Sequence, residues 1–208
     1  SSTGVTRTAS TSTTKPTADL AKYDLYLRTQ TMELLKNCGP LLTIWFDVPQ
    51  VYGPEYGIKM VNDLRKIQPD LMINNRAHNG GGKRDSVGDY DTPEQRVGGF
   101  NRDRAWETCM TICHQWAWRP NDQMKSLKQC IQTLVTVSGG DGNFLFNVGP
   151  MLDGGIERRQ IDRLAEMGKW LEKFGETVYE TRGGPFKPGK WGAATCKGST
   201  IYVHILDN

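Results

Sequence analysis

Trp45 and Asp47 stand at the end of a short apolar run, LLTIWFD, that is typical of a β-strand. Aspartate at a strand end is commonly a turn former or a helix N-cap. Here Val48-Pro49 follows instead of a helix, and Trp45 shares one face of the strand with Asp47. An indole beside a carboxylate at the mouth of a barrel can hold a sugar ring against a nucleophile. We favour this second interpretation.

Polar and aromatic side chains follow the other predicted strands as well. They are Asn75 and Arg76 at the end of the second strand, Trp116 and Trp118 at the end of the third, and Asn147 at the end of the fourth. Ligands of parallel α/β proteins bind at the carboxyl ends of the strands. The sequence therefore predicts a binding site formed by residues of this set.

A stretch of roughly thirty residues between Arg76 and Glu107 shows no helical period. Loops of this length inside a compact domain are usually functional or disordered. It carries Asp85, Asp89, Asp91, Glu94 and Glu107. Most of them are expected to be solvated, but a glycosidase would need only one to reach over the mouth opposite Asp47 as general acid.

The elements that position these residues follow from hydrophobic periodicity. Helices are predicted at 18–37, 56–67, 123–137 and 156–175, and strands at 41–47, 71–76, 106–118, 142–150 and 199–208. Helices that alternate with short apolar strands indicate a parallel sheet covered by helices, either doubly wound or part of a (β/α)8 barrel. Four strand–helix units cannot close a barrel of about 250 residues. On the barrel interpretation, the first half lies outside this chain.

Composition narrows the function classes. The chain has 208 residues, 37% hydrophobic and 24% charged, with a net charge of +3, which is too small a bias to indicate a nucleic-acid or membrane partner. Its five cysteines contain no CxxC spacing and its three histidines share no ligand spacing, so we expect no metal and no cofactor. His114, next to the Trp116–Trp118 pair, has the best claim among the histidines to a pocket role, and His204 the weakest.

The motifs in combination resemble the α-L-fucosidases of glycoside hydrolase family 29. They are WFD at 45–47, QPDLMINNR at 68–76, GDYDTPEQ at 88–95, WETCMTI at 106–112, GNFLFNVGP at 142–150 and the helix that contains Trp170. The resemblance runs from about residue 19 to the end of the chain. It implies a (β/α)8-like barrel, here only its second half (19–182), after a loop or linker (1–18) and before the first strand of a β-sandwich domain (183–208).

The resemblance also implies roles for single residues. Asp47 corresponds to the nucleophile of a retaining enzyme, and Trp45 and Arg76 correspond to side chains that contact fucose. Asn75 stands where many relatives carry Asp, a departure that leaves the arginine in place. The family lacks helices beside strands five and six, which agrees with the helix-free stretch after Arg76.

The general acid/base has two candidates, Glu94 and Glu107. If 106–118 is a strand that runs toward Trp116, Glu107 lies near its lower end, whereas Glu94 lies in a connection that starts at the rim beside Arg76. We therefore favour Glu94, and the alternative role for Glu107 is to pair with a buried donor.

Further expectations concern the whole protein. The resemblance implies a fucosylated oligosaccharide or glycoprotein glycan as partner, an extracytoplasmic (periplasmic, secreted or lysosomal) location, and leaves a homo-oligomer of the full-length enzyme open. Nothing before residue 19 resembles the upstream fucose-binding strands of the family, so we expect residues 1–208 alone to have an incomplete site. Two alternatives remain: a glycan-binding pseudo-enzyme that uses Trp45, Trp116 and Trp118 as platforms, and a structural α/β interaction domain.

Overall fold

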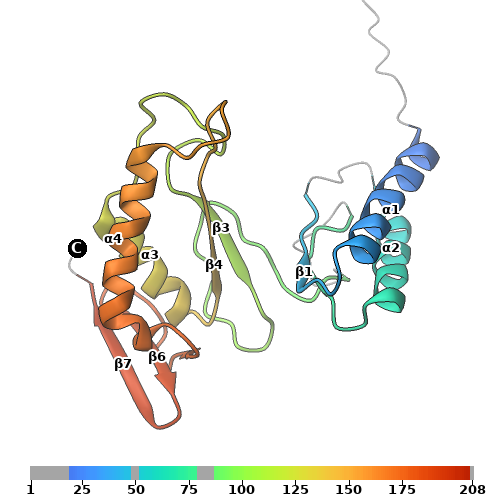
Figure 1. The fold of residues 1–208 in the computed structure, drawn as a ribbon. Coiled ribbons are helices and arrows are strands. Elements are labelled where there is room, and N and C mark those ends of the chain that lie inside the picture. Colours follow the sequence, from blue (N-terminus) through green and yellow to red (C-terminus); the bar gives the residue numbers. More distant parts are fainter. Residues whose placement is uncertain (1–18, 48–51, 79–86, 207–208) are drawn as a thin grey trace, which may run out of the picture.

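The computed structural model describes residues 19–47, 52–78 and 87–206 (Figure 1). The elements in chain order are α1 (Leu20–Asn37), β1 (Thr43–Ile44), α2 (Pro54–Ile67), β2 (Met72–Ile73), β3 (Glu107–Thr111), α3 (Leu127–Gly139), β4 (Asn143–Asn147), α4 (Arg158–Phe174), the 3-10 helix η1 (Gly175–Thr177), β5 (Arg182–Gly183), β6 (Gly192–Lys197) and β7 (Thr200–Ile205). The expected linker at 1–18 lies outside the described residues.

The first four strands pair in parallel. β1 pairs with β2, and β3 pairs with β4. An extended segment, residues 89–95, connects the two pairs through parallel bridges. In it the Asp89 N–H donates to the Ile73 carbonyl at 2.7 Å, and the Pro93 carbonyl accepts from the Cys109 N–H at 3.0 Å. The spatial order is therefore β1, β2, segment 89–95, β3 and β4, which confirms the predicted parallel α/β arrangement.

Several predicted strand boundaries were wrong. The strand expected at 41–47 is regular only over Thr43–Ile44, and the strand expected at 106–118 ends at Thr111. After Thr111 the chain folds back on itself, because the Asp122 carboxylate accepts from the Gln115 N–H at 2.8 Å. Trp116 and Trp118 consequently lie in a loop and not at a strand end. The stretch expected to lack a helix contains none within its described residues, and it supplies the extended segment 89–95.

The first two strands are held in place by a buried cluster beneath α1 and α2. Helix α2 begins at Pro54, where the fixed φ of proline suits the first turn. It buries Met60, Val61 and Leu64, which pack in one cluster with Ile73 of β2. This packing fixes where β1 and β2 end, and therefore where Asp47 and Arg76 stand.

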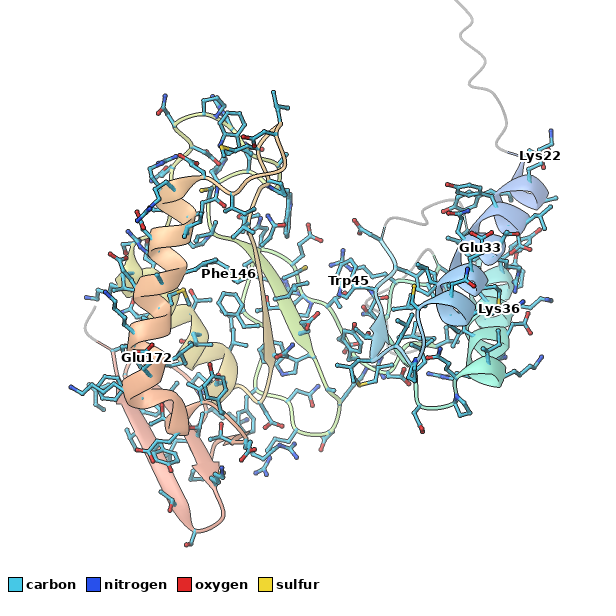
Figure 2. The ribbon with its side chains drawn as sticks, viewed as in Figure 1. Lys22, Glu33, Lys36, Trp45, Phe146 and Glu172 are labelled. Carbon is cyan, nitrogen blue, oxygen red and sulfur yellow. The ribbon has the colours of Figure 1, made fainter. Side chains whose placement is uncertain are left out.

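Helices α3 and α4 lie together on one side of β3 and β4 (Figure 1). Helix α3 starts with a capping box, in which Ser126 and Gln129 each accept a hydrogen bond from the other's backbone N–H. Phe144 and Phe146 share one face of β4 with their ring centroids 4.7 Å apart, and Phe146 points from β4 toward the helices (Figure 2). On the opposite face of β4, Leu145 is 42% exposed.

The last three strands form an antiparallel sheet in the order β5, β6, β7. The alternating pattern at 199–208 is confirmed as β7, whereas β5 and β6 were not predicted. Strand β6 packs against α3 at a glycine: a Cβ on Gly139 would lie 2.8 Å from the Cβ of Ala193. The close approach ties this sheet to the helix layer.

Two surveys of the described residues bear on function. None of the helices in this part of the chain is long and apolar enough to cross a membrane. No group of three His, Cys, Asp or Glu side chains within the described ranges is arranged to hold a metal ion. Cys109, Cys113 and Cys130 are buried, whereas Cys38 is exposed.

Candidate active site

Arg76, three residues beyond β2, is the centre of the polar cluster at the carboxyl ends of the strands. Its Nε donates to the Thr92 hydroxyl at 2.7 Å, and its Nη2 donates to the Thr92 carbonyl at 2.9 Å. Its Nη1 donates to Glu94 Oε2 at 2.8 Å and to Asp47 Oδ1 at 3.3 Å. The guanidinium carbon also lies 4.6 Å from the centre of the Trp45 ring. One side chain thus contacts three of the predicted site residues.

The two carboxylates come from different elements, yet they face the same nitrogen. Because one oxygen of each contacts Arg76 Nη1, at 3.3 and 2.8 Å, those oxygens lie no more than about 6 Å apart. Retaining glycosidases hold their two carboxyl groups about 5–5.5 Å apart. Asp47 and Glu94 are both exposed, whereas the Arg76 side chain between them is only 19% exposed. The Arg76 guanidinium is thus held in place by its neighbours, whereas the Asp47 and Glu94 carboxylates are accessible to a ligand.

Glu107 occupies a different place. It stands at the start of β3. Its Oε1 accepts from Trp45 Nε1 at 3.3 Å, and its Oε2 accepts from Asn143 Nδ2 at 2.5 Å. Both carboxylate oxygens of Glu107 therefore have a partner. The Trp45 indole lies between Glu107, to which its N–H donates, and Arg76, which lies over its ring. Trp45 points from the end of β1 toward β3 (Figure 2).

The backbone before Asp47 is held by a side chain that the sequence analysis did not single out. The Asn74 amide accepts from the Phe46 N–H at 2.9 Å and donates to the Phe46 carbonyl at 2.8 Å. Asn74 is fully buried. The sequence did contain a signal for this role: Asn74 is a polar residue two positions before Arg76, on the same face of the strand. Thr92, two residues before Glu94, carries the same signal.

Comparison with known proteins identifies the family. The family profile described as "Alpha-L-fucosidase" matches residues 3–176. The chain belongs to the α-L-fucosidase family. It is 28% identical over 189 residues to plasma α-L-fucosidase of Pongo abelii, covering 84% of this chain and 40% of that protein. It is 33% identical over 110 residues to the human plasma enzyme, covering 49% of this chain and 24% of that protein.

Solved structures of fucosidases share the fold. Isoenzyme 1 of Paenibacillus thiaminolyticus superposes with a TM-score of 0.83 at 31% identity, over 93% of this chain and 49% of that one. The Thermotoga maritima α-fucosidase, solved in complex with fucose, gives 0.71 at 27% identity, over 88% and 42%. The catalytic domain of these enzymes is a (β/α)8 barrel. The chain spans about half the length of such relatives.

Three predicted binding residues of this fucosidase-family chain lie apart from the Arg76 cluster. Trp116 is 40% exposed, and its carbonyl accepts from Asn147 Nδ2 at 2.9 Å. Trp118 is half-buried, and His114 is exposed. In the described ranges none of the three forms a hydrogen bond or ion pair with Arg76, Asp47 or Glu94. They sit in the loop after β3, at the carboxyl end of the β3–β4 pair.

Two further carboxylates of the long stretch, Asp89 and Asp91, have structural partners. Asp89 accepts from the Ile73 N–H at 2.7 Å and from Arg65 at 2.5 Å. Asp91 accepts from Arg104 Nε at 2.8 Å. Asp85 lies outside the described residues. Of the candidates for a general acid that the structure describes, only Glu94 shares a contact with Asp47.

Proposed function

We propose that the protein at its full natural length is a retaining α-L-fucosidase that removes terminal α-L-fucose from oligosaccharides or glycoprotein glycans. The observation that carries this proposal is the shared contact of Asp47 and Glu94 with Arg76 Nη1. Family membership makes fucose the sugar, and the fucose complex of the Thermotoga maritima relative supports that choice.

The proposed reaction is a double displacement. The Asp47 carboxylate attacks the anomeric carbon while the Glu94 carboxylic acid protonates the glycosidic oxygen, so that the carbon–oxygen bond breaks and the aglycone leaves as an alcohol. Glu94, now a carboxylate, then takes a proton from water. The oxygen of that water attacks the anomeric carbon, releasing fucose and the free Asp47 carboxylate. Two inversions give net retention.

The neighbouring residues have proposed supporting roles. Arg76 lies between the two carboxylates, where its donors can bind sugar hydroxyls. Trp45 offers an indole face to the apolar side of fucose. Trp116, Trp118 and His114, which lie further along the same rim, would contact the rest of the glycan. Glu107, with both oxygens occupied, would orient Trp45.

Architecture and location are proposed on the same basis. We assign residues 19–182 to the second half of a (β/α)8-like barrel and residues 183–208 to the beginning of a β-sandwich. The five parallel-paired segments and the change to antiparallel pairing at β5 support this division. The relatives named plasma α-L-fucosidase support an extracytoplasmic location.

The test removes the nucleophile and then replaces it. In the protein at its full natural length, Asp47→Gly should lower hydrolysis of an aryl α-L-fucoside by about 10³-fold or more. Sodium azide should restore turnover and yield β-L-fucosyl azide, because azide enters from the face that the carboxylate vacated. Unchanged activity in Asp47→Gly would refute the assignment.

The wild-type protein separates this proposal from its alternatives. A wild-type protein that binds fucose without hydrolysing the glycoside would be the glycan-binding pseudo-enzyme. One that neither binds nor hydrolyses would be a structural α/β domain.

A further inference from the structure

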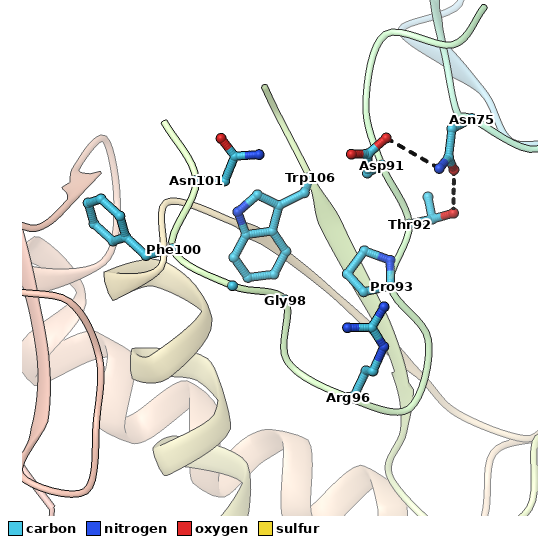
Figure 3. A pocket seen from close by; sticks show the side chains of 10 residues that line it. Asn75, Asp91, Thr92, Pro93, Arg96, Gly98, Phe100, Asn101 and Trp106 are labelled. Carbon is cyan, nitrogen blue, oxygen red and sulfur yellow. Dashed lines mark hydrogen bonds between the residues drawn. The ribbon is translucent and has the colours of Figure 1, made fainter. Parts of the chain in front are cut away.

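A chain of hydrogen bonds, buried at its centre, runs from Arg76 away from the two carboxylates. The Thr92 hydroxyl, which accepts from Arg76 Nε at 2.7 Å, donates to Asn75 Oδ1 at 2.8 Å. Asn75 Nδ2 donates to Asp91 Oδ1 at 3.3 Å, and that oxygen also accepts from Arg104 Nε at 2.8 Å. Asn75 and Thr92 are 2% and 7% exposed. Figure 3 shows Asn75 bonded to both Asp91 and Thr92.

The chemistry of the end groups fixes the direction of every bond in this chain. A guanidinium only donates, so the Thr92 oxygen must present a lone pair to Arg76 and has its single proton left for Asn75. The Asn75 oxygen accepts that proton, and its NH2 therefore faces Asp91. An ionised carboxylate only accepts, which suits Asp91 at the far end. Hydrogen-bond polarity thus allows one orientation of the Asn75 amide.

We propose that Thr92 and Asn75 are positioning residues for Arg76, which hold its guanidinium plane so that Nη1 lies between Asp47 and Glu94. This inference rests on the proposed fucosidase activity. Thr92 contacts two nitrogens of the guanidinium, because its hydroxyl accepts from Nε and its carbonyl accepts from Nη2 at 2.9 Å. The carbonyl contact belongs to the backbone and survives substitution. The hydroxyl contact is lost when Thr92 is replaced by a residue without a hydroxyl, and its hydrogen bond to Asn75 is lost when Asn75 is truncated.

A cavity gives access to this chain from outside the catalytic cluster. It has a volume of about 510 Å³ and is lined by residues that include Asn75, Asp91, Thr92, Pro93, Arg96 and Trp106 (Figure 3). Truncation of Asn75 would open a space the size of a carboxamide between Asp91 and Thr92. Formamide, which carries the same donor and acceptor atoms, could reach that space through the cavity.

The experiment uses aryl α-L-fucoside hydrolysis by the protein at its full natural length. Thr92→Val, which keeps the shape but removes the hydroxyl, should lower kcat by about 10–100-fold, because misplacement by about 1 Å costs rate on this scale. Thr92→Ser should recover most of the loss. Asn75→Ala should show a similar defect that formamide relieves, while formamide should not stimulate Thr92→Val or the wild type.

Thr195→Val is the matched control. Thr195, in β6, is a buried threonine like Thr92, and its hydroxyl donates to the Thr177 carbonyl of η1 at 2.6 Å. This variant should lose stability without losing kcat.

Two results are distinguishable. If the wild type hydrolyses fucoside and Asp47→Gly is inactive, but Thr92→Val and Asn75→Ala lose no more kcat than Thr195→Val, the positioning role is refuted while the proposed function stands. An inactive wild type refutes both. If Thr92→Val does not fold, formamide relief of Asn75→Ala decides the matter, and its absence in a folded Asn75→Ala protein counts against the proposal.

Discussion

At the scale of single residues, position in the hydrogen-bond network separates Glu94 from Glu107. The Glu94 side chain accepts from Arg76 through Oε2 and is 43% exposed, so that its other oxygen is available to a leaving group. Glu107 is engaged on both oxygens by Trp45 and Asn143. A general acid must reach the departing oxygen. Geometry therefore favours Glu94, in agreement with the argument from its place at the rim.

This difference predicts distinct responses to leaving-group chemistry. Glu94→Gln should slow hydrolysis of fucosides with poor leaving groups by about 10²–10⁴-fold, and should affect a dinitrophenyl fucoside far less, because a good leaving group departs unprotonated. Glu107→Gln should lower the rates of both substrates by a similar factor. Steady-state kcat/KM for the two substrate types is the measurement. The reverse pattern would transfer the acid/base role to Glu107.

At the scale of elements, the extended segment 89–95 explains how distant parts of the chain meet. Its backbone bonds to Ile73 on one side and to Cys109 on the other. Glu94 pairs with Cys109 in this ladder, so the register against β3 sets the height of Glu94 at the rim. A shift of one residue would turn Thr92 and Glu94 to the other face. The catalytic proposal depends on this register.

The contact between β7 and α4 makes a prediction about pH. The centres of the His204 and Trp170 rings lie 6.2 Å apart. Burial lowers the pKa of His204 below its ordinary value near 6.5, and a hydrogen bond to the Thr177 backbone raises that pKa by a smaller amount. His204 therefore binds a proton more readily in the unfolded chain than in the folded one. The free energy of unfolding should consequently fall as the pH drops below about 6.5.

Replacement of His204 should flatten that dependence. The slope from one group cannot exceed about 1.4 kcal/mol per pH unit. His204→Gln should remove the corresponding part of the change in urea midpoint between pH 7.5 and 5.5, whereas His114→Gln, at an exposed position, should leave it intact. An identical pH dependence in wild type and His204→Gln would contradict the burial argument.

At the scale of the whole molecule, the two outermost parallel strands, β1 and β4, each have one unpaired edge within the described residues. Within the described ranges β1 pairs only with β2, and β4 only with β3 (Figure 1). Large apolar side chains stand exposed nearby: Leu42 is 76%, Leu145 is 42% and Met72 is 41% exposed. Unpaired strand edges beside apolar surface promote association.

Residues 1–208 expressed alone should therefore be poorly soluble and self-associate. Light scattering coupled to size-exclusion chromatography is the measurement, with the protein at its full natural length as the comparison. Monomeric 1–208 that unfolds cooperatively would contradict the prediction and would mean that the exposed leucines are covered in another way.

The sequence by itself determined the four helices, the approximate places of the parallel strands and the chemistry at the strand ends. Periodicity located α1 to α4 to within a few residues, and the residue types marked Asp47, Arg76 and Trp45. Both follow from interactions among near neighbours in the chain, because burial on one face of a helix or strand leaves its repeat in the sequence.

Only the tertiary structure decided which carboxylate meets Asp47 and what holds Arg76 in place. Asp89, Asp91 and Glu94 look alike in a charged stretch, and the arginines that contact them lie 13 to 24 residues away in the chain. Sheet register and the polarity of the Thr92–Asn75–Asp91 bonds arise from contacts between segments that leave no repeat in the sequence. Those contacts turned Asp89 and Asp91 into structural residues and left Glu94 facing Asp47.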